Sequence, residues 1–216
     1  MDWFRVLLLL SLAVLGRGVD AQDKDAGAPD PFVHVDAERG FSVARPSEDW
    51  AVRTASQGGA VAVSFTPREG RGWVRFSVLV VPITGARDPA DARDAMLDWI
   101  DEREGDGYEN ARAFDAAVDG REAAGLQYDG SGIERFARIR QVIVHEHGLR
   151  FVLSAQVAPP RDFDAWAAQF DRIVASFRFV EPGAERRAAL RLAELAARGR
   201  AQLDWAPTCD DAAARA

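Results

Sequence analysis

The sequence predicts an α+β domain in which a mostly antiparallel sheet carries helices packed on its faces. Three observations predict it. Short runs that alternate between apolar and polar residues fill residues 33–81, a capped helical segment begins near residue 88, and a second set of strands precedes an aromatic helical segment near residue 163. Strands that follow one another through tight turns pair antiparallel, and amphipathic helices must bury their apolar side against a sheet.

The first strands are short and separated by glycine-rich turns. A run at 32–35 is consistent with an edge strand, and clearer strands follow at 41–44, 50–53, 60–65 and 73–81. Gly58-Gly59 and Gly70-Arg71-Gly72 are expected to form the turns between the last three. Residues 78–81 (VLVV) lose the alternation, which predicts a central strand that is covered on both faces.

The segment from Asp88 is a helix with a clear start. Aspartate is a preferred N-cap and Pro89 suits the first helical position, so we expect a helix from Asp88 to about Glu104. Its apolar face and its acidic face lie on opposite sides at helical spacing. The apolar residues are Ala92, Met96, Trp99 and Ile100, and the acidic residues, expected to face solvent, are Asp91, Asp94, Asp98 and Asp101.

The second half repeats the pattern of strands followed by a helix. Residues 118–121 (VDGR) carry a hairpin signal, and strands are predicted at 123–128, 136–144 and 149–157. A helix is expected to open at Asp162. Its apolar residues lie at helical spacing and are largely aromatic, so this helix must cover a sheet: Phe163, Trp166, Ala167, Phe170, Ile173, Val174 and Phe177.

The N-terminal residues indicate export. Residues 6–15 (VLLLLSLAVL) are an apolar run too short to span a bilayer, and Val19-Asp20-Ala21 suits cleavage by signal peptidase after Ala21. We expect a signal peptide at 1–21, a disordered polar linker at 22–31, and a periplasmic or extracellular protein. An uncleaved signal anchor is the alternative reading.

The C-terminal residues predict an extra helix outside the main domain at 32–180. Residues 181–204 read as a basic amphipathic helix, and residues 205–216, with the lone Cys209, as a loose tail. Three arginines are candidate partner-binding residues: Arg187, Arg191 and Arg198. The apolar side of this helix is mostly alanine, which favours packing on the domain or a partner over contact with a membrane surface.

The order of elements and several local motifs resemble the PsbP-like fold family. That family includes the photosystem protein PsbP, a eukaryotic Ran-binding import factor and bacterial envelope proteins of the DcrB type. Gly40-Phe41-Ser42-Val43 followed by Pro46 and Trp50 resembles its opening strand and turn, and the helix that ends at Ser176-Phe177 resembles its last helix. The resemblance spans about residues 32–180, implies a non-catalytic interaction module, and carries over no catalytic residue.

The motif His145-Glu146-His147-Gly148 has two readings. In an extended segment, His145 and His147 point to the same side and are candidate zinc or copper ligands. A stable site needs a third or fourth ligand, and nothing in the sequence brings His34, the remaining histidine, near them. The other reading is a polar turn between two strands, in which Gly148 supplies an unusual backbone conformation.

The net charge and the missing sequence motifs argue against several classes of function. The net charge of −7 is unsuited to nucleic acid, which needs a cationic surface. Sequence motifs for nucleophilic, phosphate-binding or zinc-dependent enzymes are missing, so we expect no enzyme and no cofactor. The expectation is an exported binding module whose partner is another envelope protein. A metal-binding domain that uses His145 and His147, or a carrier of a small apolar ligand, is the alternative, and the sequence leaves the oligomeric state open.

Overall fold

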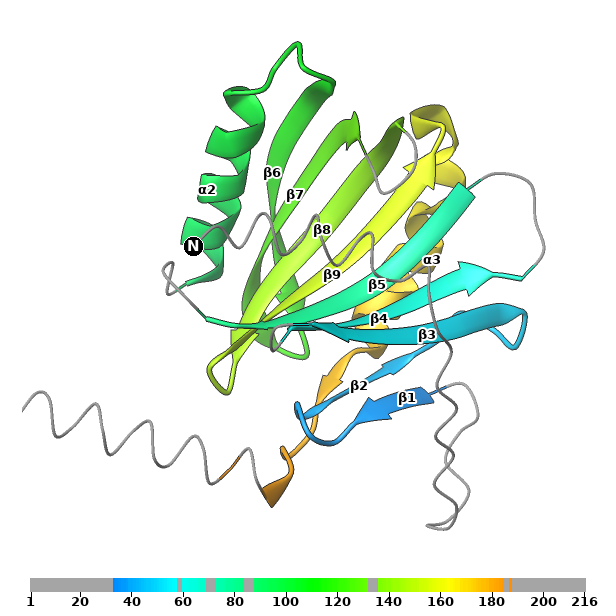
Figure 1. Ribbon diagram of the computed structural model, residues 1–216, viewed down its shortest axis with the longest axis vertical. Coiled ribbons are helices and arrows are strands. Elements are labelled where there is room, and N and C mark those ends of the chain that lie inside the picture. Colours follow the sequence, from blue (N-terminus) through cyan, green and yellow to red (C-terminus); the bar gives the residue numbers. More distant parts are fainter. Residues whose placement is uncertain are drawn as a thin grey trace, which may run out of the picture.

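The computed structural model describes residues 33–57, 60–68, 73–83, 88–131, 136–184 and 187. Within them ten strands form two sheets (Figure 1). The strands are β1 (Val33–Asp36), β2 (Phe41–Ala44), β3 (Trp50–Gln57), β4 (Ala60–Pro67), β5 (Trp73–Pro82), β6 (Tyr108–Val118), β7 (Arg121–Ser131), β8 (Phe136–Glu146), β9 (Leu149–Ala158) and β10 (Arg178–Phe179). The helices are α2 (Pro89–Asp101), the short 3₁₀ helix η1 (Pro160–Asp162) and α3 (Asp164–Ser176).

The large sheet has seven strands in the order β3-β4-β5-β9-β8-β7-β6, and all neighbours pair antiparallel. The predicted α+β class with a mostly antiparallel sheet is therefore confirmed. The central position expected for residues 78–81 is also confirmed, because β5 lies between β4 and β9 and these four side chains are all buried. Since β5 pairs with β9, which comes much later in the chain, the two predicted groups of strands form one sheet.

The two helices cover opposite faces of this sheet. Helix α2 packs on β6, β7 and β8, at the left of Figure 1, through Ala92, Met96 and Ile100. Helix α3 lies behind the sheet and buries Phe170 and Ile173 in a separate core. Each face therefore has its own apolar cluster, and α2 packs on only one half of its face.

Helix α2 begins as the sequence predicts. The Asp88 carboxylate accepts a hydrogen bond from the Asp91 amide at 2.8 Å, and Pro89 occupies the first turn. The helix ends at Asp101 rather than near Glu104, because the chain there turns toward Gly105, whose φ of +91° favours glycine. The opening of the later helix also differs, since Pro160–Asp162 form a separate 3₁₀ turn before α3 begins at Asp164.

The small sheet has the order β1-β2-β10 and joins the two ends of the described domain. Gly40 precedes β2 with a φ of +76°, and a Cβ there would come within 2.8 Å of the Val180 carbonyl oxygen. Glycine is thus required both by the backbone conformation and by the close approach of the chain after β10. The Val180 amide in turn donates to the Gly40 carbonyl oxygen at 3.0 Å.

Strand β6, like the two-residue β10, is not predicted by the sequence pattern. Strand β6 is eleven residues long, yet it is mostly exposed and rich in alanine and charged residues. It is an edge strand with a bulge between Glu109 and Arg112, so its apolar side chains do not alternate cleanly.

Several predicted segments lie outside the described residues. They are the signal peptide at 1–21, the linker at 22–31, the tail at 205–216 with Cys209, and most of the basic helix at 181–204. Within the part of the chain that the structure describes, no helix is both long and apolar enough to cross a membrane.

Candidate functional site

The two candidate metal ligands lie at the hairpin between β8 and β9. His147 and Gly148 form its two-residue turn with φ values of +50° and +69°, the left-handed conformation of both central residues in a type I′ turn. The premise of an extended segment is therefore wrong for His147. His145 stays in β8, opposite Arg150 of β9, and its Nε2 accepts a hydrogen bond from Arg150 Nε at 3.0 Å.

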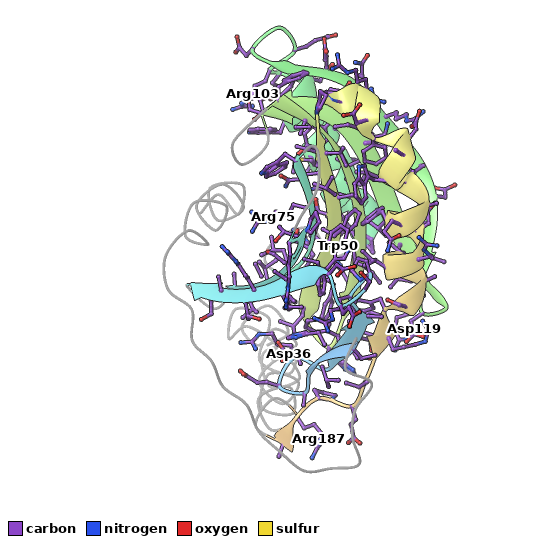
Figure 2. All side chains as sticks on the ribbon, turned by 90° about the vertical axis from the view of Figure 1, so that its right-hand side faces the viewer. Asp36, Trp50, Arg75, Arg103, Asp119 and Arg187 are labelled. Carbon is purple, nitrogen blue, oxygen red and sulfur yellow. The ribbon has the colours of Figure 1, made fainter. Side chains whose placement is uncertain are left out.

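The charges around this turn are paired with one another. Arg121 of β7 donates to the Glu146 carboxylate at 2.5 Å, and this hydrogen bond lowers the pKa of Glu146 below its ordinary value. His147 Nε2 lies 3.5 Å from the other Glu146 oxygen. In the neighbouring turn, the Asp119 carboxylate accepts from the Phe179 amide at 2.9 Å. These contacts fasten two hairpin turns and β10 to one end of the sheet, at the lower right of Figure 2, where Asp119 is labelled.

A metal centre at this turn would need further ligands. Among the described residues, no three His, Cys, Asp or Glu side chains gather in a way that would hold a metal ion. His34 lies half-buried in β1, where this partial burial lowers its pKa. The structure therefore adds no third ligand to His145 and His147 among the described residues.

The three candidate arginines are only partly described. Arg187 lies near the end of the small sheet, at the bottom of Figure 2, where its Nη1 is 3.2 Å from a Glu181 carboxylate oxygen and donates to the Pro182 carbonyl at 2.6 Å. Arg191 and Arg198 lie outside the described residues. Their role as partner-binding residues stays a prediction.

An ion pair between the partly exposed Arg138 and the buried Asp129 links β8 and β7 on the face that α3 covers. Arg138 donates to both Asp129 oxygens, at 2.7 and 2.8 Å, and Asn110 of β6 adds a third hydrogen bond at 3.0 Å. Burial alone would raise the pKa of Asp129, but the hydrogen bonds from Arg138 and Asn110 outweigh it and lower the pKa. Both oxygens of this carboxylate therefore accept hydrogen bonds from side chains of neighbouring strands.

The α2 side of the sheet carries a different feature at its centre. Polar side chains occupy two successive same-face positions on both β5 and β9. Arg75 of β5 lies opposite Gln156 of β9, and Ser77 lies opposite Ser154. The register extends this group to β4, where Ser64 faces Ser77, and to β8, where Gln141 faces Ser154. We call these six residues the central polar patch: Ser64, Arg75, Ser77, Gln141, Ser154 and Gln156. Apolar residues that share the face, such as Leu79, Val152 and Ile139, border it.

The patch is buried but not internally satisfied. Ser64, Arg75, Gln141 and Ser154 are at most 8% exposed. Arg75 donates to the Ser64 hydroxyl at 2.9 Å. By contrast, Gln141 Oε1, Ser154 Oγ and Gln156 Oε1 are buried oxygens with no hydrogen-bond partner in the described structure. A buried polar atom without a partner costs about 1–3 kcal/mol, so three at the centre of one sheet are unusual.

The charged side chains that β3, β4, β5 and β9 direct to this side are arginines. Arg53 of β3 stands opposite Ser64 and extends the row that Ser64, Ser77, Ser154 and Gln141 form. The described residues of β3, β4, β5, β9 and β8 that point to this side include no Asp or Glu. Figure 2 shows Arg75 and Arg103 on one side of the sheet and the yellow helix α3 on the other. This part of the face therefore has a local positive charge in an otherwise acidic chain, with Arg53 exposed and Arg75 buried.

Sequence reasoning missed the patch, although it left a signal. The pairs Arg75 with Ser77 and Ser154 with Gln156 are polar residues two apart in strands predicted to be apolar. Such spacing places both side chains on one face of a strand. Bringing the two pairs together requires the pairing of β5 with β9, which is a long-range contact that local patterns do not encode.

Comparison with solved structures identifies the fold of the chain. The solution structure of cyanobacterial PsbP from Synechocystis sp. PCC 6803 matches with a TM-score of 0.51 and 16% identity, covering 73% of this chain and 98% of that one. The chain has the PsbP-like fold. The resemblance expected from the sequence is thereby confirmed at the level of the fold.

Two further solved structures are similar over a smaller share of the chain. LpqN of Mycobacterium tuberculosis, described as involved in cell envelope biogenesis, has a TM-score of 0.43 and 14% identity over 65% of this chain and 83% of its own. PA94 of Pseudomonas aeruginosa, of unknown function and described as a putative regulator, has a TM-score of 0.37 and 17% identity over 57% and 96%. No protein-family model and no curated protein sequence matches the chain.

Proposed function

We propose that this PsbP-like protein is an exported, non-enzymatic binding module of the bacterial cell envelope. The central polar patch carries the proposal. Apolar side chains at Gln141 and Ser154 would avoid the cost of their unpartnered oxygens, so stability alone does not account for these polar residues. Positions where a sequence departs from the rules of stability are expected to be functional sites.

The placement of the ionisable groups supports binding rather than catalysis. Glu146 is held by Arg121, Asp129 by Arg138 and Asn110, and His145 accepts from Arg150. Side chains that transfer protons must be able to reach a substrate, and these are engaged in fastening strands to one another. The apolar run at 6–15 and the small residue at Ala21 support export.

Two edge strands support the expectation of an envelope protein as partner. Val35 on β1 is 52% exposed and Val52 on β3 is 38% exposed, and both strands lie at the edge of their sheets. An edge strand offers backbone groups to which a strand of another protein can pair, and an exposed valine adds apolar contact.

Site-specific photocrosslinking in living cells tests the binding role. A photoreactive amino acid is placed at Thr66, which is near the patch on β4, at Val52 on the β3 edge, and at the half-buried Gln169 of α3 as the control position. A binding module should give a defined product from Thr66 or Val52 that Gln169 does not give, identified by mass spectrometry. Equal labelling at all three positions would mean that neither surface is a binding face.

A further inference from the structure

The size of the central polar patch limits what it can bind. It spans four neighbouring strands, β4, β5, β9 and β8, and two successive positions along β5 and β9. With strands about 4.8 Å apart and same-face residues about 6.7 Å apart, it covers about 14 Å by 7 Å. That area suits a small molecule, such as one sugar ring with a substituent, better than a protein surface.

The cationic end of the patch selects for an anion. The Ser64 hydroxyl accepts from the Arg75 guanidinium, and Arg53 stands opposite Ser64 on the next strand, so two arginines border one hydroxyl. Arg75 is only 8% exposed, and a charge in such surroundings interacts more strongly than one in water. A guanidinium offers a planar fork of donors that matches a carboxylate or a phosphate.

The other end of the patch selects for hydrogen-bond donors. Gln141 Oε1 and Gln156 Oε1 are acceptors, and Ser154 Oγ between them can accept or donate. None has a partner in the described structure, so a ligand that supplies hydroxyl hydrogens would satisfy all three at once. Trp73, two residues before Arg75 on the same strand face and opposite Ala158 of β9, adds a half-buried aromatic surface on the side of the patch where Arg75 and Gln156 lie.

Taking the binding role proposed above as given, we propose that the central polar patch binds a small anion that carries neighbouring hydroxyl groups. The carboxylate or phosphate lies at Arg75, and the hydroxyls donate to Gln141, Ser154 and Gln156. A sugar acid and a sugar phosphate share this chemistry. Neither a bare anion nor a neutral sugar can engage both ends of the patch.

Thermal denaturation and calorimetric titration of the purified full-length protein test this assignment. The probes are glucuronate and glucose 6-phosphate, with glucose, acetate and inorganic phosphate as partial ligands. We expect glucuronate or glucose 6-phosphate to raise Tm saturably and each partial ligand to bind at least about tenfold more weakly, the equivalent of about 1.4 kcal/mol. The stronger of the two complete probes identifies the anionic group as carboxylate or phosphate.

Two variants and a matched control locate the site. Gln141→Met removes one acceptor with little change in volume and should weaken binding about tenfold, and Arg75→Met should abolish it. Gln127→Met is the control, because Gln127 is also a buried glutamine but lies on the opposite face of the sheet, and it should bind as the unaltered protein does. If Arg75→Met does not fold, Gln141→Met still decides the question.

The outcomes separate this inference from the proposed function. The absence of binding by both complete probes, or binding that survives Gln141→Met unchanged, would overturn the assignment of a hydroxylated anion. If a product of another kind is then crosslinked at Thr66, the patch is still a binding face and only the ligand class is wrong. If Thr66 gives no product either, the binding role of the patch fails together with the inference.

Discussion

The ring of Phe41 in β2 stacks on the ring of Phe177, which directly follows α3, with centroids 5.5 Å apart and planes within 7° of parallel. Both side chains are fully buried. Phe151 of the central strand β9 meets both rings edge-on, at 5.7 Å from each. This pair therefore joins the small sheet, helix α3 and the large sheet in one aromatic cluster.

The stack should be a main support of the fold. We expect Phe41→Ala to lower the free energy of unfolding by about 3–5 kcal/mol, the usual cost of removing a buried aromatic side chain. Urea denaturation followed by tryptophan fluorescence measures this. Phe136→Ala is the control, since Phe136 is 43% exposed and should change stability by less than about 0.5 kcal/mol. Similar losses in both variants would show that the small sheet is not fastened through Phe41.

The ion pair between Asp129 and Arg138 should make stability depend on pH in the acid range. The pKa of Asp129 is lowered in the folded protein, so its contribution is present above the ordinary pKa of about 3.9 and is lost as the pH falls. We expect Asp129→Asn to cost about 2 kcal/mol at pH 7 and progressively less toward pH 3. Urea denaturation across this pH range tests it, and a cost that is independent of pH would contradict the role of the charge.

Residues 180–184, just after β10, should contribute more to thermal stability than residues 185–216. The Gly183 amide donates to the Ala37 carbonyl oxygen at 2.7 Å, and Pro182 is buried beside Gly40. We expect removal of residues 185–216 to leave Tm nearly unchanged, because the apolar side of that segment is mostly alanine. Removal of residues 180–216 should lower Tm. Equal Tm values for the two shortened proteins would contradict this division.

Zinc tests the hypothesis of a metal site at the β8–β9 turn. His145 is engaged by Arg150, and His147 occupies a left-handed turn position, so we expect zinc to leave Tm unchanged. A saturable rise in Tm that is lost in the double variant His145→Ala/His147→Ala would establish the metal site instead. His34→Ala serves as the control, because His34 lies in β1 of the small sheet and outside the β8–β9 turn.

Much of the fold was predictable from local patterns. Asp88 and Pro89 predicted the start of α2, residues 78–81 predicted a central strand, and the aromatic spacing from Phe163 predicted a helix that covers a sheet. Strand β6 was not predicted, because an exposed, bulged edge strand has no clean apolar alternation. The separate small sheet also escaped, since β10 is two residues long and pairs with a strand near the other end of the chain.

The candidate site was less predictable than the fold. The sequence drew attention to His145 and His147 because histidines are rare in this chain, but the turn places them in a cluster of paired charges. The central polar patch consists of ordinary Ser, Gln and Arg residues from four strands. It becomes visible only when the strand order and register are known, since each strand alone contributes one or two polar residues.

The central claim is that the residues of the central polar patch serve binding and do not stabilise the fold. A comparison of two serines, Ser154 and Ser176, tests this claim most directly. Ser154 Oγ has no partner, whereas Ser176 Oγ donates to the Ile173 carbonyl at 2.7 Å and accepts from the Ala44 amide at 3.1 Å. The measurement is the free energy of unfolding of Ser154→Ala and Ser176→Ala in urea without ligand. We predict a loss of about 1–2 kcal/mol for Ser176→Ala and no loss, or a small gain, for Ser154→Ala. An equal loss in both variants would show that Ser154 serves the fold and would contradict the account.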